Sequence, residues 1–164
     1  MNNTWMVLDD VRKRVFYLIV AEKIFSFINM NNSNYDEGRK ALDICWESLV
    51  DAKITGDDIY LLIDSPVYNY IGEFAQQEEN PKKQEIWYIL LDVIGYIAWN
   101  LYRKSGVKFL PQALESISED SAFDFIRNLE ESGYIKKEDV NNVLEILGDK
   151  NTDISKGNIK YMLL

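Results

Sequence analysis

Apolar residues recur along the chain at three- and four-residue steps, and no segment keeps a regular alternation of apolar and polar positions between hairpin turns. This pattern is typical of amphipathic helices and predicts an all-α protein. A chain of 164 residues fits one domain with a buried core. We therefore expect residues 1–164 to form a single-domain bundle of about six to eight helices.

The longest apolar segment predicts a central helix over about residues 82–104. Between residues 86 and 102 almost every position is apolar except Asp92, Gly95 and Asn100, so most sides of this helix should be buried. The segment is shorter than the roughly 20 apolar residues that a bilayer requires, and it carries an aspartate in its middle. A core helix is therefore favoured over a membrane span.

The other helices are predicted from periodicity and from residues that can cap a helix. The capping patterns are Thr4, Thr55-Gly56-Asp57-Asp58, Ser65-Pro66 and Asn80-Pro81. Besides the central helix, we expect helices over about 4–29, 36–53 and 55–63, one starting at 66, and others over 118–133, 137–147 and 156–162.

The chain has 27 acidic and 18 basic residues, a formal charge of −9 and no histidine. Imidazole is the group most often used for acid and base catalysis near neutral pH, so its absence argues against an enzyme. The negative charge repels nucleic-acid phosphates and anionic lipid and favours a basic partner. We expect a monomer or small homo-oligomer that binds a basic protein and contacts neither nucleic acid nor membrane directly.

Candidate cofactor and metal sites are weak in this sequence. One cysteine and no histidine serve zinc poorly, and no glycine-rich phosphate loop occurs. Cys45 lies on an apolar helix face, so we interpret it as a buried thiol and not as a nucleophile. We predict no catalytic residue, metal or cofactor. A lone cysteine and an N-terminus without signal-peptide features predict a cytoplasmic location.

Asp92 is the unusual polar residue of the central helix. An ionised carboxylate among Leu90, Leu91, Val93 and Ile94 needs a partner or a raised pKa. Either it lies on the one wet edge of this helix, or it is paired with a lysine or arginine. An alternative function follows, in which Asp92 and an acid from a neighbouring helix serve a carboxylate-dependent metal protein or enzyme.

A stretch without lysine or arginine, between Ile54 and Pro81, combines acidic residues with tyrosines. Carboxylates speed encounter with a basic protein, and tyrosine rings supply contact area. The alternative is that the tyrosines fill the core and the acids cap helices. This candidate binding face, the first acidic surface, comprises Asp57, Asp58, Tyr60, Asp64, Tyr68, Tyr70, Glu73, Glu78 and Glu79.

A second acidic surface is expected near the helix that follows Ser118, where Arg127 is the one basic residue among six acidic residues. Whether it extends the first surface or lies opposite depends on helix packing angles, which the sequence leaves open. Its members are Glu115, Glu119, Asp120, Asp124, Glu130 and Glu131.

Three short segments of the chain together resemble a known protein family. The run Arg39-Lys40-Ala41-Leu42-Asp43-Ile44-Cys45-Trp46, followed by Thr55-Gly56-Asp57-Asp58-Ile59-Tyr60 and Ile63-Asp64, resembles small all-α immunity proteins of bacterial polymorphic toxin systems. The resemblance implies a cytoplasmic protein that binds and neutralises a cognate toxin domain. It assigns no functional residue to this sequence.

These observations lead to a main hypothesis and alternatives. The protein is predicted to be a non-enzymatic inhibitor that occludes its toxin through the acidic, tyrosine-rich face. Many such toxins are basic nucleases, and the carboxylates of an acidic protein can mimic the phosphates that these toxins would otherwise bind. The metal protein or enzyme using Asp92 and a scaffold or regulatory subunit without a toxin partner remain as alternatives.

Overall fold

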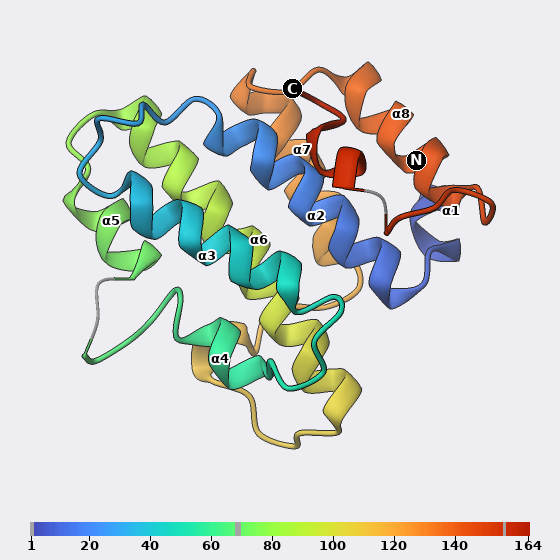
Figure 1. Ribbon diagram of the computed structural model, residues 1–164, viewed down its shortest axis with the longest axis horizontal. Coiled ribbons are helices and arrows are strands. Elements are labelled where there is room, and N and C mark those ends of the chain that lie inside the picture. The colour runs from blue at the N-terminus through green and yellow to red at the C-terminus, as the bar shows by residue number, and fades with distance from the viewer. Residues whose placement is uncertain (1, 68–69, 156) are drawn as a thin grey trace.

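The computed structural model describes residues 2–67, 70–155 and 157–164, and these contain helices and no strand (Figure 1). The predicted all-α class is therefore confirmed. The elements in chain order are α1 (Asn2–Val7), α2 (Asp10–Phe25), α3 (Tyr35–Glu47), α4 (Gly56–Tyr60), α5 (Ile71–Gln77), α6 (Pro81–Ser105), the 3-10 helix η1 (Gln112–Leu114), α7 (Ser121–Ser132), α8 (Lys137–Gly148) and the 3-10 helix η2 (Gly157–Tyr161).

Helix α6 is the predicted central helix. The Asn80 side chain accepts hydrogen bonds from the backbone N–H groups of Lys82 and Lys83, and Pro81 occupies the first turn. The helix ends at Gly106, which has a φ of 73°, a left-handed conformation that glycine adopts at little cost. Because α6 packs against α2, α4 and α5 at once, most of its length is buried.

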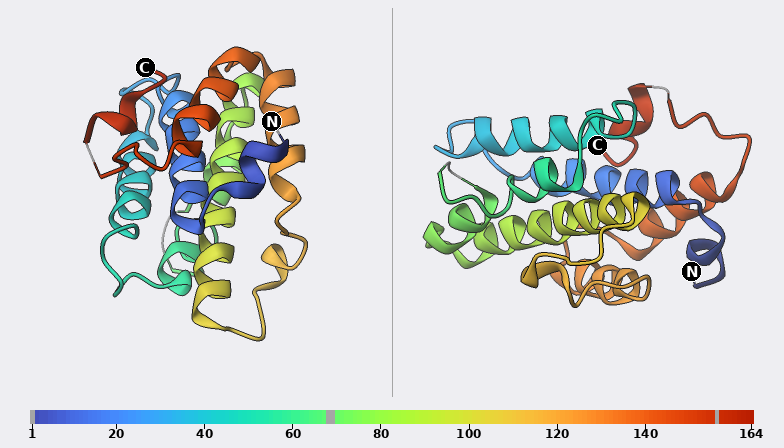
Figure 2. Two further views of the ribbon diagram at one scale, coloured as in Figure 1. Left: turned by 90° about the vertical axis from the view of Figure 1, so that its right-hand side faces the viewer. Right: turned by 90° about the horizontal axis from the view of Figure 1, so that it is seen from below.

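The helices lie in layers on either side of α2 and α6. Figure 2 shows α3 on one side of this pair and α7 with η1 on the other. Tyr17 of α2 joins the inner layers, because its ring stacks on Tyr96 of α6 at 4.0 Å between centroids and on Phe125 of α7 at 4.6 Å. Stacked aromatic rings add to the burial of apolar area, so this column helps to fix α7 on the core.

The predicted first helix is wrong in its extent, because the chain breaks at Leu8 and Asp9 into α1 and α2. Thr4 lies inside α1 and does not cap it. The cap belongs to Asp9, whose side chain accepts from Arg12 N at 2.8 Å. Trp5 is fully buried, and this anchor holds α1 on the bundle.

The helix predicted to start at Ser65-Pro66 is also wrong. Residues 65–67 are not helical, and α5 begins later, at Ile71. The backbone N–H of Ile71 donates to the carbonyl of Leu62 at 2.9 Å, so the start of α5 is held beside the turn that follows α4. A proline can start a helix, but it fits an extended loop equally well.

Four further predictions differ in their ends or helix type, among them the helix expected over 55–63, which ends at Tyr60. Helix α3 stops at Glu47 instead of 53, and α7 starts at Ser121, whose hydroxyl accepts from the backbone N–H of Ser118 at 2.9 Å. The helix expected over 156–162 is a 3-10 helix over Gly157–Tyr161, and Lys156 lies outside the described residues. Short capping side chains support neighbouring starts almost equally well, which limits the prediction of helix ends.

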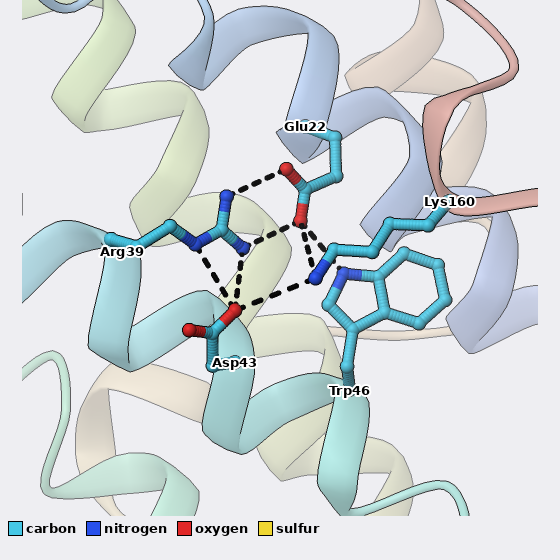
Figure 3. Close-up of polar contacts among 5 residues, drawn as sticks. All are labelled: Glu22, Arg39, Asp43, Trp46 and Lys160. Atoms are coloured by element: carbon cyan, nitrogen blue, oxygen red, sulfur yellow. Dashed lines mark hydrogen bonds and ion pairs between the residues drawn. The ribbon is translucent and has the colours of Figure 1, made fainter. Parts of the chain in front are cut away.

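An ion-pair network around the buried carboxylate of Glu22, here called the Glu22 network, joins α2, α3 and η2 (Figure 3). Glu22 accepts two hydrogen bonds from the Arg39 guanidinium, at 2.7 and 2.6 Å, and one from Trp46 Nε1 at 2.9 Å. Lys160 of η2 lies 3.7 Å from the same carboxylate and 3.4 Å from Asp43. The network therefore fixes α3 and the C-terminal segment on α2.

Candidate functional site

The α4 end of the first acidic surface is built by a capping box. The backbone N–H of Thr55 donates to the Asp58 carboxylate at 2.8 Å, and the Thr55 hydroxyl accepts from Asp58 N. Asp57 accepts from the Tyr102 hydroxyl of α6 at 2.6 Å. Both aspartates are exposed, but their oxygens also hold α4 in place, so part of the capping alternative applies to them.

The tyrosines of this surface are partly buried. The Tyr60 hydroxyl donates to Asp64 at 2.9 Å, and desolvation together with this hydrogen bond raises the pKa of Tyr60 to about 12. Tyr60 also packs against the core. Tyr70 is half-buried at the start of α5, and Tyr68 lies outside the described residues.

Three glutamates continue the surface along and beyond α5. Glu73 accepts from Gln77 and Glu78 accepts from the backbone of Asn80, and both are half-buried, whereas Glu79 is exposed. Among the residues that the structure describes, no lysine or arginine forms an ion pair with any carboxylate of the first acidic surface. Its negative charge is therefore left to act on the solvent side.

An apolar groove of about 390 Å³ lies beside this surface, between α3, the turn that follows α4, and α5. Leu61 on its edge is 49% exposed, and Glu37 and Lys40 of α3 line it as well. The groove brings desolvated contact area next to the charges. This α3–α5 groove is lined by Glu37, Lys40, Ala41, Ile44, Leu61, Leu62, Tyr70, Ile71 and Phe74.

One carboxylate of the second acidic surface, that of Glu119, has a structural role. Glu119 binds Lys13 at 2.9 Å and also Arg103, and thereby connects α2, α6 and the segment before α7. Partial burial opposes ionisation of Glu119, but the hydrogen bonds from these two cations prevail and lower its pKa. The charge of Glu119 is thus compensated within the fold.

The remaining carboxylates of the second surface face solvent to different degrees. Asp124 pairs with Arg127 at 2.6 Å, an exposed contact three residues apart on one helix. Glu115, Asp120 and Glu131 are exposed and Glu130 is half-buried. None of these four forms an ion pair within the described part of the chain.

Asp92 lies on the wet edge of α6, the first of the two possibilities that its apolar surroundings left open. The side chain is exposed, yet it lies in a depression between α6, η1 and α7. Neighbouring protein atoms displace part of its hydration, which raises the pKa of Asp92 to about 6. Asp124 lines the same depression, so one residue of the second surface lies near it.

A reactive thiol, a metal site and a membrane-spanning helix each have requirements that the described residues do not meet. Cys45 is buried, and desolvation raises the pKa of its thiol, which confirms the buried thiol. In the ranges described, no three His, Cys, Asp or Glu side chains gather as a possible metal site. No helix in these ranges has the length and apolarity needed to cross a membrane.

Two features of these surfaces were not predicted from the sequence. The α3–α5 groove needs residues from α3, from the turn after α4 and from α5, and Ile44, Leu61 and Phe74 give no local sign that they share one wall. The depression at Asp92 likewise combines residues from α2 to α7. Only the isolated carboxylate in the apolar run of α6 could have pointed to it.

Comparison with known proteins places the chain in a family. No curated protein and no solved structure matches it. The family model described as Immunity protein Imm6 matches residues 12–132, which is well over half of the chain and includes both acidic surfaces. The resemblance to bacterial toxin immunity proteins is therefore confirmed: the chain belongs to the Imm6 family of immunity proteins, whose function implies a cognate bacterial toxin as partner.

Proposed function

We propose that this immunity protein neutralises a basic toxin domain by binding it and covering its active surface, without catalysis. The toxin would belong to a polymorphic toxin system, and binding would take place in the cytoplasm of the producing cell. The observation that carries the proposal is the first acidic surface, whose carboxylates have no cationic partner in the described part of the chain and border the α3–α5 groove.

Charge and groove have different tasks in this proposal. The carboxylates accelerate encounter with a basic protein and disfavour wrong partners. Affinity then comes mainly from a few desolvated contacts, for which the groove offers Leu61, Leu62 and Tyr70. A basic nuclease would fit this surface, because its substrate site is built to attract phosphate oxygens and carboxylate oxygens can take their place.

Co-expression with the toxin encoded by the neighbouring gene tests the function itself. Cells that carry the toxin should survive with this protein and die without it. Equal killing in both cases would remove the proposal, and so would protection by a protein that forms no complex with the toxin.

Charge reversal tests the proposed surface. Asp57 and Asp58 are poor choices, because they support α4. Glu73→Lys combined with Glu79→Lys should slow association about tenfold at low salt and weaken the salt dependence. The matched control is Glu138→Lys with Glu145→Lys, the same charge change on exposed positions of α8. Equal effects of the two pairs would mean that net charge matters and the surface does not.

The groove is tested by a single substitution. Leu61→Asp places a charge at a half-exposed apolar position and should speed toxin dissociation with little change in the fold. Val50→Asp is its control, because Val50 is an exposed valine outside the α3–α5 groove. If Leu61→Asp leaves dissociation unchanged, the groove is not part of the interface.

A further inference from the structure

The depression between α6, η1 and α7 forms a pocket of about 420 Å³, here called the α6–α7 pocket. Gly95 contributes no side chain to its wall. A methyl group built there would lie 3.7 Å from both Ile117 Cδ1 and Leu114 Cδ2. The pocket therefore owes part of its open space to this glycine, and a pocket of this size can hold a whole side chain of a partner.

The wall of this pocket combines an apolar base with oxygen atoms. Leu91 and Ile117, which are half-buried, and Ala113, which is exposed, supply the accessible apolar surface, whereas Tyr17 and Phe125 are almost fully buried. Asp92 and Asp124 bring carboxylates to the same pocket. No lysine or arginine is among its described lining residues, although Arg127 pairs with Asp124 on the exposed side of α7. A partner that brings N–H donors on an apolar stem would match both parts.

The α6–α7 pocket lies close to residues of both acidic surfaces. Ile63 lines it and is the sequence neighbour of Asp64, a member of the first acidic surface. Asp124 belongs to the second surface and lines it as well. A protein that covers one of the two surfaces therefore has the pocket within reach.

We propose that the α6–α7 pocket receives an arginine or lysine side chain of the toxin, with the aliphatic stem against Leu91 and Ile117 and the cationic end beside Asp92. This inference rests on the proposed function, since it names the part of the toxin that the pocket binds. It adds an anchor on the η1 and α7 side to the contacts proposed at α4 and α5.

A small probe tests the pocket without the toxin. Capped arginine, N-acetylarginine amide, is titrated into the ¹⁵N-labelled full chain, and the amide shifts are followed by NMR. We expect saturable shifts at Gly95, Ser121 and Asn128, whose side chains or backbone line the pocket. Capped citrulline, which has a similar shape but no charge, should bind severalfold more weakly.

Two variants complete this experiment. Asp92→Asn should weaken capped arginine severalfold, and because Asp92 is exposed, the fold should be retained. Glu145→Gln on α8 removes the same charge from a remote exposed position and should leave binding unchanged. Equal binding of citrulline, shifts spread evenly over α8, or an unchanged affinity in Asp92→Asn would each overturn the proposal.

A second experiment measures the affinity of pocket variants for the toxin. Gly95→Leu fills the pocket and should reduce toxin affinity about tenfold, whereas Gly95→Ala adds one methyl group at ordinary contact distance and should reduce it far less. Circular dichroism shows whether Gly95→Leu is folded, and Asp92→Asn keeps the test decisive if it is not.

The two proposals fail in distinguishable ways. If Glu73→Lys with Glu79→Lys weakens the toxin complex while Asp92→Asn and Gly95→Leu do not, the pocket proposal is wrong and the proposed function stands. If no toxin complex forms at all, the proposed function is wrong.

Discussion

Replacing Glu22 by glutamine removes the negative charge at the centre of the Glu22 network while keeping the size of the side chain. The carboxylate is 3% exposed and accepts from Arg39 and Trp46, with Lys160 at 3.7 Å. An amide in its place has one N–H₂ group, which would face the N–H groups of the guanidinium. Both cations would then have lost their most buried counter-charge.

The size of the effect follows from how exposed the cations are. Removing one partner of a fully buried pair costs about 3–5 kcal/mol. Arg39 and Lys160 are 27% and 22% exposed, and both keep Asp43 within 3.4 Å, so the expected cost is about 2–4 kcal/mol. For a chain of this length that is a fall in Tm of roughly 5–15 °C.

Urea unfolding followed by circular dichroism measures this free energy, and calorimetry gives the Tm. Asp43→Asn is the control, because this carboxylate is 51% exposed and an exposed ion pair contributes less than about 1 kcal/mol. A double-mutant cycle with Arg39→Gln should give a coupling free energy of about 1–3 kcal/mol. A cost for Glu22→Gln below about 0.5 kcal/mol, or one equal to that of Asp43→Asn, would refute this reasoning.

Three further substitutions test the local structure by urea unfolding. Thr55→Ala removes the capping hydroxyl of α4 and should cost about 1 kcal/mol, whereas Thr55→Ser should be nearly neutral; equal costs would contradict the cap. Gly38→Ala would place a methyl group 2.8 Å from Phe25 Cε2 and should cost about 1–3 kcal/mol, while Gly157→Ala, with open space around it, should change little; the reverse order would contradict the close packing. The pKa of Asp92, raised from 3.8 to about 6, means that the folded state favours the protonated form, so stability falls as pH rises from about 4 to about 6. The pKa difference sets an upper limit of roughly 3 kcal/mol on this loss of stability, and the exposure of the side chain reduces it to about 1 kcal/mol or less. Asp92→Asn should therefore raise the free energy of unfolding at pH 7 and not at pH 4. An equal increase at both pH values would exclude the raised pKa as the cause.

The sequence predicted best where local signals and burial agree. Asn80-Pro81 and Gly106 bracket a long apolar run, and the structure has α6 between them. The capping box at Thr55 likewise involves residues three apart in the chain. Such features need no knowledge of the tertiary structure, because every group that satisfies them lies within one turn.

The wrong predictions concern breaks whose cause lies far away in sequence. Asp9 could have stood inside one long helix, but burial of Trp5 against Phe16 and Tyr96 turns α1 away from α2. Ser65-Pro66 offered a helix start, but the chain pairs Ile71 with Leu62 and begins α5 later. Tertiary packing decides between such local options.

The acidic positions could be read from the sequence, but their roles could not. Glu119 and Glu79 look alike in the sequence, and yet Glu119 is held between Lys13 and Arg103 while Glu79 is exposed. A carboxylate attracts a partner only if the fold has not already neutralised it. Because this depends on cations distant in sequence, composition alone overestimates the binding surface.

The distribution of ion pairs separates stability from recognition in this molecule. The interhelical pairs of Glu22 and Glu119 tie α2 to α3, α6 and η2, whereas the carboxylates of the first acidic surface have no such pairs in the described part of the chain. Unpaired surface charges contribute little to folding but set the field that steers a partner. Substitutions in the Glu22 network should therefore lower the Tm and leave toxin association of the folded protein nearly unchanged. Substitutions at Glu73 and Glu79 should instead leave the Tm nearly unchanged and slow toxin association. Measuring the Tm and the association rate for both sets of variants therefore tests whether folding and recognition use different charges.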